Sequence, residues 1–174
     1  VTLYAVWKAN SYTVTFNTDG GSAVQSQTVV YNGKATRPVS DPEKVGYTFK
    51  GWFEGEVEYD FDNAVTADIE LTAKWEINTY TVTFNAGEGQ FSYDSIQNDQ
   101  KTIELEVQYG GNAYEALYKL VNFKIIAPED YIVEGFEVVG GSYSSMFYVT
   151  KELNVNITYS KTEVIVYMLG LDGT

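Results

Sequence analysis

The sequence repeats itself, and this internal repeat limits the architectures open to the chain more than any other feature. Residues 12–17, with the sequence YTVTFN, recur letter for letter at residues 80–85, an offset of 68 positions. At the same offset, residues 3–8 return in diverged form as residues 71–76. Self-similarity at a fixed period is typical of modules arranged in series, so the sequence predicts a tandem array.

The offsets divide the chain into four parts. Residues 1–8 are expected to be the last strand of a preceding, truncated repeat, and residues 9–76 to form one whole module. Residues 77–161 are expected to form a longer and diverged module, and residues 162–174 to begin a following module or form a tail. Both ends are expected to cut through structure, as in a piece of a longer polypeptide.

The second module is longer because it carries insertions. Gly51 and Trp52 return as Gly135 and Phe136, an offset of 84 that exceeds the first offset of 68 by sixteen residues. Ten of these residues fall between the first two predicted strands, and six fall further along. Insertions in a repeat usually map to loops on one face, so they mark where the second module is expected to differ.

Hydrophobic periodicity predicts mostly strands. Apolar and polar residues alternate over residues 12–17, 69–75 and 102–109, which indicates strands with one buried and one solvated face. Residues 112–121 instead show helical spacing, with Asn112 placed to cap the helix. In the first module Pro38 and Pro42 leave room for only a short turn of helix. Each module is therefore expected to be α+β and strand-rich, a small mixed sheet with one short helix.

Composition excludes several classes of chemistry. The chain of 174 residues has no Cys and no His, which removes thiol nucleophiles, thiolate metal sites, disulfides and imidazole catalysis. Its 24 acidic and 11 basic residues give a net charge of −13, which disfavours nucleic acid and anionic lipid as partners. No run of eighteen apolar residues occurs, so no membrane insertion is predicted, and no signal peptide lies within this segment.

Several separated motifs of the first module occur in the order found in one bacterial repeat family. They are residues 12–17, Asp19–Gly21, residues 29–35, Pro38, Pro42, residues 46–53 and residues 66–75. In these motifs the first module resembles the Listeria–Bacteroides repeat, the B repeat of internalin-type bacterial surface proteins. The second module keeps only the first and last strands of the pattern and replaces the Gly-Trp pair by Gly135 and Phe136.

The resemblance implies a ubiquitin-like β-grasp fold for each module and occurrence in strings on secreted or wall-associated proteins. It implies no catalytic residues and no cofactor. The family is usually described as a spacer or as an interaction module of modest affinity.

The densest group of charges suggests a calcium site. Glu58, Asp60 and Asp62 lie in a run of five acidic residues that begins at Glu54, and Ca²⁺ prefers several carboxylate oxygens. These acids alternate with Gly55 and other uncharged residues, so a solvated face of one strand is the competing and favoured interpretation.

A second candidate site is aromatic. Tyr143, Phe147 and Tyr148 cluster near the end of the second module and are candidates for binding protein or glycan. The competing and favoured interpretation is an added strand buried against Phe136 and Val138. An intramolecular isopeptide bond between Lys and Asn or Asp also stays open at this point.

These observations favour a non-catalytic segment of a bacterial cell-surface protein that acts as a semi-rigid spacer. Its expected partners are neighbouring repeats of the same polypeptide, with weak contacts to a host or cell-wall protein or glycan. The alternative is an adhesive module centred on the diverged second repeat. An enzyme would need a polar pocket that brings carboxylates together, which modules of this size are not expected to contain.

Overall fold

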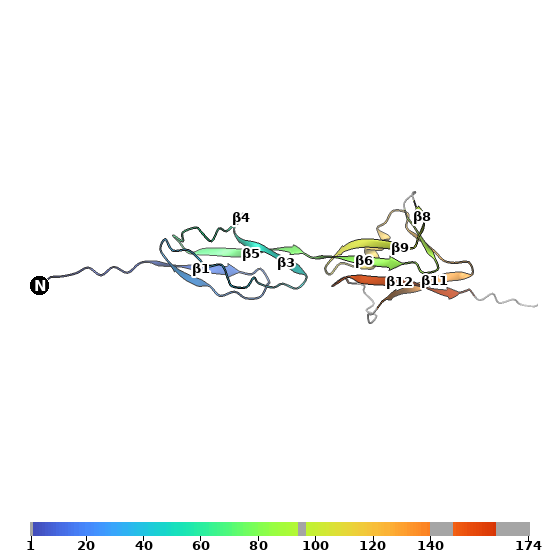
Figure 1. The fold of residues 1–174 in the computed structure, drawn as a ribbon, viewed down its shortest axis with the longest axis horizontal. Helices are drawn as coiled ribbons and strands as arrows, with labels where there is room; N and C mark the ends of the chain where they lie inside the picture. Colours follow the sequence, from blue (N-terminus) through green and yellow to red (C-terminus); the bar gives the residue numbers. More distant parts are fainter. Residues whose placement is uncertain (1, 94–96, 140–147, 163–174) are drawn as a thin grey trace, which may run out of the picture. The chain divides into compact units, whose positions relative to one another are not determined.

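The computed structural model of the protein describes residues 2–93, 97–139 and 148–162 (Figure 1). The chain divides into two compact units, Val1–Asn78 and Thr79–Thr174. The described residues hold a single helix, α1 (Ala113–Tyr118), and their remaining regular structure is strand. This confirms the prediction of a strand-rich chain built from small mixed sheets.

The first unit is a five-stranded sheet with the order β2-β1-β5-β3-β4. Its strands are β1 (Ser11–Asn17), β2 (Gln27–Val30), β3 (Tyr47–Glu54), β4 (Val57–Glu58) and β5 (Ile69–Ile77). The first and last strands, β1 and β5, are parallel neighbours, and the other pairs are antiparallel. The chain therefore enters at one end of this sheet and leaves at the other.

The core of the first unit lies on one face of this sheet, as the alternation predicted. Val14 and Phe16 of β1 are buried, whereas Thr13 and Thr15 between and beside them are exposed. Trp52 is 1% exposed, and its ring meets that of Phe16 edge to face at 4.8 Å. Burial of one large aromatic ring gives this small core much of its apolar area.

The predicted turn of helix in the first unit is wrong. Residues 31–46 contain no helical residue and run through turns, bends and irregular backbone between β2 and β3. Proline has no N–H to give to a helix, and it disfavours the helical conformation of the residue before it. With Pro38 and Pro42 four positions apart, no helical turn forms in this stretch.

The main sheet of the second unit has the order β11-β12-β6-β9. Its strands are β6 (Thr79–Asn85), β9 (Thr102–Gln108), β11 (Tyr131–Val138) and β12 (Leu153–Lys161). Here too the first and last strands, β6 and β12, are parallel neighbours. The path of the chain through the first sheet is thus repeated in the second.

Helix α1 covers the second sheet from the predicted position. Asn112 caps the helix, because its side-chain oxygen accepts hydrogen bonds from the N–H groups of Tyr114 and Glu115. Ala113 and Leu117 are fully buried on the inner side of the helix. The helix is shorter than predicted, since it ends before Val121, which is 64% exposed.

The insertions build a second, three-stranded sheet with the order β10-β7-β8. It consists of β7 (Gln90–Tyr93), β8 (Gln97–Gln100) and β10 (Lys124–Ile126). The β7–β8 hairpin corresponds to the ten residues inserted between the first two strands. Phe91 of β7 is fully buried and packs near Phe123, so the insertion adds core rather than a bare loop.

The two units share one scaffold down to strand register. Val14 lies opposite Ile69 in the first unit, and Val82 lies opposite Leu153 in the second, as the offsets of 68 and 84 require. The register also shifts at the glycine of the Gly-Trp or Gly-Phe pair in both units. The sequence repeat is therefore a structural repeat.

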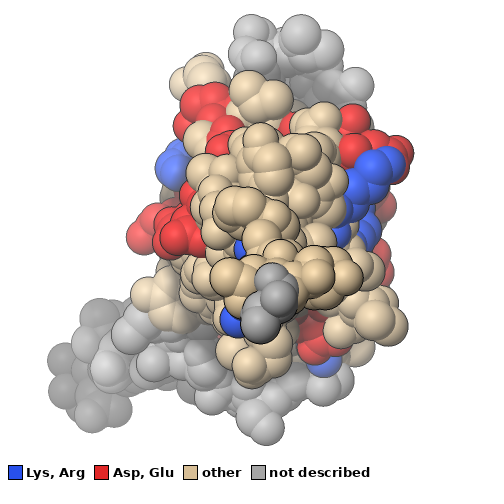
Figure 2. Space-filling view, turned by 90° about the vertical axis from the view of Figure 1, so that its left-hand side faces the viewer, with Lys and Arg blue, Asp and Glu red and all other residues tan. Residues whose placement is uncertain are grey.

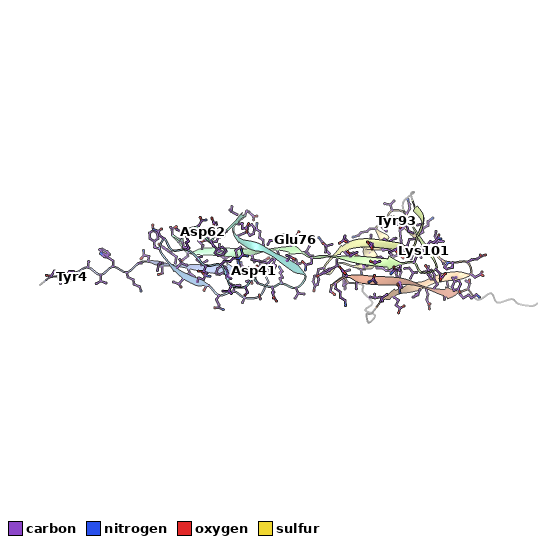
Figure 3. The ribbon with its side chains drawn as sticks, in the orientation of Figure 1. Tyr4, Asp41, Asp62, Glu76, Tyr93 and Lys101 are labelled. Carbon is purple, nitrogen blue, oxygen red and sulfur yellow. The ribbon has the colours of Figure 1, made fainter. Side chains whose placement is uncertain are left out.

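The segment before β1 makes no strand within the described residues. Leu3, Tyr4, Val6 and Trp7 are 85–94% exposed, and the side chain of Tyr4 is labelled in Figure 3. The corresponding residues of β5 gain their hydrogen bonds from β1 and β3 on either side.

Candidate functional site

The acidic run from Glu54 to Asp62 is a turn and a short hairpin, not a single strand. β3 ends at Glu54, Gly55 turns the chain with φ +61°, and β4 covers only Val57 and Glu58. The acidic side chains are exposed, as expected of a solvated surface, but they do not share one strand face. The prediction of a single strand through this run is wrong.

Lysines from distant parts of the first unit pair with these acids. Lys34 Nζ lies 2.7 Å from Asp62, and Lys74 pairs with Glu56. The hydrogen bond and charge of each lysine lower the pKa of its partner carboxyl, and Asp62 in turn raises the pKa of Lys34. Figure 2 shows acidic and basic side chains interleaved around the margin of one face.

The three calcium candidates do not converge on a point. Asp62 is bound to Lys34, while Asp60 accepts a hydrogen bond from the backbone N–H of Asp62 at 2.9 Å. Glu58 stands on β4. Across residues 2–93, 97–139 and 148–162, no three acidic side chains lie close enough to hold a metal ion.

Lys34 and Asp62 also bear on the isopeptide question. Their side chains are 58% and 85% exposed. Asp62 raises the pKa of Lys34 and Lys34 lowers the pKa of Asp62, so each residue favours the charged form of the other. Amide formation needs a neutral amine and a protonated acid, so this pair is suited to an ion pair and not to a covalent link.

Of the three aromatic candidates, Tyr143 and Phe147 lie outside the described residues. Tyr148 is described, and its side chain is half-exposed. Its backbone forms a bridge with Asn112, which corresponds to the bridge between Lys34 and Ala64 in the first unit. The backbone of Tyr148 thus holds a shared scaffold contact, while its ring stays accessible.

The helix α1 carries a tyrosine pair that the sequence reading did not single out. The rings of Tyr114 and Tyr118 lie 4.7 Å apart between centroids, and their hydroxyls are 3.2 Å apart. Burial, the hydrogen bond with Tyr118 and the charge of that residue raise the pKa of Tyr114 to about 12. Spacing of four residues on a predicted helix is the signal that could have revealed this pair.

Backbone carbonyl groups of the second unit converge on an ammonium. Lys101, labelled in Figure 3, donates hydrogen bonds from its Nζ to the carbonyl oxygens of Gly87 and Glu88 at 3.3 and 3.0 Å, and to that of Gly89. A ring of carbonyl oxygens is an arrangement that suits a hard cation. Here the lysine supplies the positive charge and ties the turn after β6 to the junction between β8 and β9.

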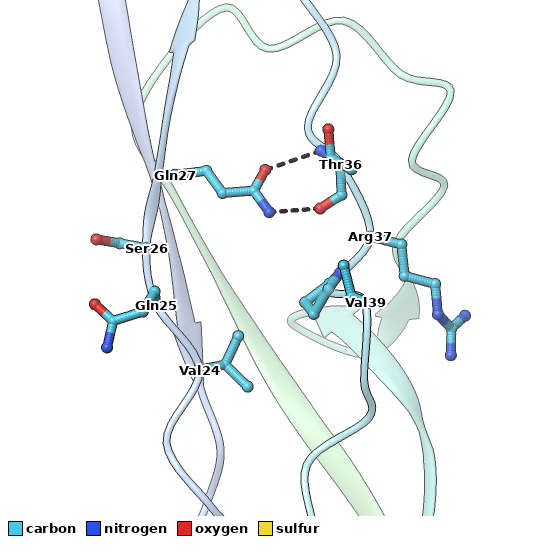
Figure 4. A pocket seen from close by; sticks show the side chains of 8 residues that line it. Val24, Gln25, Ser26, Gln27, Thr36, Arg37 and Val39 are labelled. Carbon is cyan, nitrogen blue, oxygen red and sulfur yellow. Dashed lines mark hydrogen bonds between the residues drawn. The ribbon is translucent and has the colours of Figure 1, made fainter.

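A groove of about 300 Å³ lies beside the edge strand β2 in the first unit (Figure 4). Residues 24–27 form one wall and residues 36–39 the other. The Gln27 side chain spans it, donating to the carbonyl oxygen of Thr36 at 2.5 Å and accepting from its N–H at 2.9 Å. Arg37 is turned to Asp41 at 3.0 Å, so the groove holds no free titratable pair.

The groove lies where the second unit has its helix. Ala35 corresponds to Ala113 at an offset of 78, and both are buried. Four residues later, Val39 is fully exposed, whereas its counterpart Leu117 is fully buried on α1. In the second unit, helix α1 thus occupies the place that stays open in the first unit.

A second groove, of about 410 Å³, is lined by the start and end of the acidic hairpin. It includes Glu54, Tyr59 and the stretch of residues 63–67. Burial and the charges of Glu54 and Asp60 raise the pKa of Tyr59. Neither groove brings two carboxylates together, so neither has the geometry of a general acid and base pair.

Comparison with known proteins assigns the first unit. Residues 12–74 match the family model of the Listeria–Bacteroides repeat domain. The chain is 40% identical over 119 residues to a putative membrane protein of Evansella cellulosilytica, covering 66% of this chain and 16% of that protein. It is 44% identical over 64 residues to Internalin H of Listeria monocytogenes, covering 35% of this chain and 11% of that protein.

A putative Gly-rich membrane protein of Evansella cellulosilytica is 45% identical over 91 residues, which cover 50% of this chain and 10% of the relative. The chain therefore spans less than a fifth of the length of these relatives. No solved structure matches it. Within the described residues, no helix is long and apolar enough to cross a membrane.

Proposed function

Residues 12–74 are a Listeria–Bacteroides repeat domain, and from this premise we propose that the chain is a non-catalytic spacer segment of a bacterial surface protein. It belongs to a secreted or cell-wall-associated polypeptide and holds other parts of that polypeptide away from the cell. The names of the relatives, Internalin H and two putative membrane proteins, support a place at the cell envelope.

The parallel pairing of first and last strands is the observation that carries this proposal. In each unit the chain enters at one end of the sheet and leaves at the other, because β1 pairs in parallel with β5 and β6 with β12. Because the two chain ends of such a module lie at opposite ends of its sheet, the module separates the segments before and after it by the length of the sheet. Strand order and the parallel central pair also support a β-grasp fold for each unit.

Two further features support a semi-rigid spacer. Only Asn78 separates the end of β5 from the start of β6, which leaves no flexible linker. The acidity is also shared evenly, since residues 9–76 and 77–161 each contain 5 basic and 11 acidic residues, or −6 apiece. Like charge along a stalk discourages association with neighbouring stalks.

Small-angle scattering of the whole chain tests the spacer proposal. The expected result is an elongated particle whose scattering fits a narrow set of arrangements. A compact globule, or a broad ensemble of freely hinged units, would contradict it.

The alternative is an adhesive module, and the exposed ring of Tyr148 in the second unit favours it. A panel of glycans and host proteins tests it with the whole chain and a Tyr148→Ala variant. Tyr31→Ala in the first unit is a matched control, because both tyrosines are 52% exposed. Binding that is lost in Tyr148→Ala and kept in Tyr31→Ala would support the adhesive module. Absence of any binding would leave the spacer as the proposed function.

A further inference from the structure

The residue that follows the last strand of each unit is hydrogen-bonded back to the unit it leaves. The backbone N–H of Asn78 donates to the carbonyl oxygen of Gly46 at 2.9 Å. In the second unit the N–H of Thr162 donates to the carbonyl oxygen of Asp130 at 2.7 Å. Donors and acceptors are both related by the offset of 84, so this is one contact made twice.

The two acceptors share an uncommon backbone conformation. Gly46 has φ +79° and Asp130 has φ +65°, and each stands directly before the strand that flanks the last one. This left-handed conformation is easy for glycine and unfavourable for most other residues. The second unit has Asp130 in place of the glycine and keeps the same backbone conformation. The direction of the carbonyl group is therefore retained although the residue type is not.

A side chain adds a second hydrogen bond at each place. The Thr48 hydroxyl donates to the Asn78 side-chain oxygen at 2.6 Å. The Thr162 hydroxyl donates to the carbonyl oxygen of Asp130 at 2.5 Å. The two units thus fasten their exit residue with different side chains.

We propose that this contact is an exit clasp, which fixes the direction in which the chain leaves each module. The clasp joins Asn78 to the first unit, and β6 begins with the next residue, Thr79. Rotation between neighbouring modules is then confined to the single link between these two residues. The inference rests on the proposed spacer function and names the residues that give the spacer its stiffness.

The direct test measures distances between labels on the two units. The chain has no Cys, so Thr28→Cys on β2 and Glu104→Cys on β9 provide two unique, exposed sites for spin labels. Two changes open the clasp: Thr48→Val removes the side-chain bond, and Asn78→Pro removes the backbone N–H. Thr15→Val, on the solvent face of β1, is the matched control for Thr48→Val.

The distance distribution of the parent chain should be narrow. It should broaden in Asn78→Pro, and to a smaller degree in Thr48→Val, toward that of a chain with two glycines inserted after Asn78. Thr15→Val should leave it unchanged, and the Asn78 amide should exchange slowly with solvent in the parent chain. A circular dichroism spectrum like that of the parent shows that each variant is folded.

The outcomes separate the two proposals. A narrow distribution that stays narrow in the folded Asn78→Pro variant would overturn the clasp and leave the spacer intact. A parent distribution already as broad as that of the glycine-inserted chain would overturn the spacer proposal and the clasp with it. Rapid exchange of the Asn78 amide in the parent chain would overturn the clasp alone.

Discussion

The indole Nε1 of Trp75 donates a hydrogen bond to the backbone carbonyl oxygen of Thr18 at 3.0 Å. Trp75 lies on the last strand of its unit and Thr18 in the loop after the first strand, so the bond fastens that loop to the central pair. Gly21 lies flat against the same ring, where a Cβ would stand 2.6 Å from the indole. The loop can approach the ring this closely only with glycine at this position.

The second unit makes the same contact with a different ring. The Tyr159 hydroxyl donates to the carbonyl oxygen of Ala86 at 2.8 Å, and Gly89 lies against that hydroxyl. Both pairs follow from the offsets of 68 and 84. What the repeat preserves here is a donor on the last strand, an acceptor in the first loop and a glycine between them.

Tyr159→Phe should therefore destabilise the second unit by about 0.5–1.5 kcal/mol, because it removes one of the two hydrogen bonds that the carbonyl oxygen of the buried residue Ala86 accepts, the other coming from the N–H of Gly89 at 3.0 Å. Urea denaturation monitored by circular dichroism measures the change. Tyr31→Phe, at an exposed tyrosine, is the control and should leave stability unchanged. Equal midpoints for Tyr159→Phe and the parent chain would show that the hydrogen bond does not stabilise the loop.

Gly89→Ala should cost about 1–3 kcal/mol in the same assay, since the new methyl group would overlap the Tyr159 hydroxyl and lie 2.6 Å from the Ile126 carbonyl oxygen. Backbone must then move to make room. Gly135→Ala is the matched control in the same unit, because its Cβ would meet only Thr158 at an ordinary 3.7 Å. A loss of stability as large in Gly135→Ala as in Gly89→Ala would contradict the steric explanation.

Trp52→Phe should be tolerated far better than Trp52→Ala. Trp52 is 1% exposed, and its indole Nε1 has no hydrogen-bond partner among the described residues. Phenylalanine removes that unpaired group and keeps a ring, as Phe136 does at the equivalent place, whereas alanine leaves a cavity costing about 3–5 kcal/mol. Urea denaturation compares the two variants, and similar losses for both would show that the indole itself matters.

The sequence predicted the repeated scaffold well, because the signals that set it are local and periodic. Alternation located β1, β5 and β9, and the offsets of 68 and 84 relate the parallel registers of the two central pairs to each other. Asn112 predicted the start of α1, because its side chain can cap a helix N-terminus. The stretch after β2 was harder, since whether two prolines prevent a single turn of helix depends on the packing available.

The candidate site could not be predicted to the same degree, because its partners come from far along the chain. The acids of the hairpin suggested a metal site, but Lys34 and Lys74 approach them from strands and turns 18 to 28 residues away. The exit clasp joins Asn78 to Gly46, and the motif that begins at Gly46 does not reveal this partner. Such contacts depend on strand register, which a single sequence gives only where it repeats.

Tyr114 should ionise well above a free tyrosine, at a pKa of about 12, because of burial and its contact with Tyr118. The fold favours the neutral phenol, so this contribution to stability is complete below pH 10, the usual pKa. It is lost as the pH rises from about 10 to about 12. NMR titration of ¹³C-labelled tyrosine measures the pKa, and Tyr118→Phe should lower it while burial keeps it raised. An unchanged value in Tyr118→Phe would show that the pair is not coupled.

Finally, the parallel central pair predicts how the first unit resists force. Tension applied through Ala9→Cys and Thr79→Cys pulls β1 and β5 in opposite directions along their length, so their shared hydrogen bonds are loaded together. Tension through Ala9→Cys and Ala67→Cys acts at one end of the pair and breaks those bonds one after another. Both pairs of cysteines are unique in this chain. Single-molecule force measurements should therefore give a higher unfolding force for the first pair at the same loading rate. Equal forces, with equal thermal stability of the two variants, would mean that the parallel pair does not bear the load.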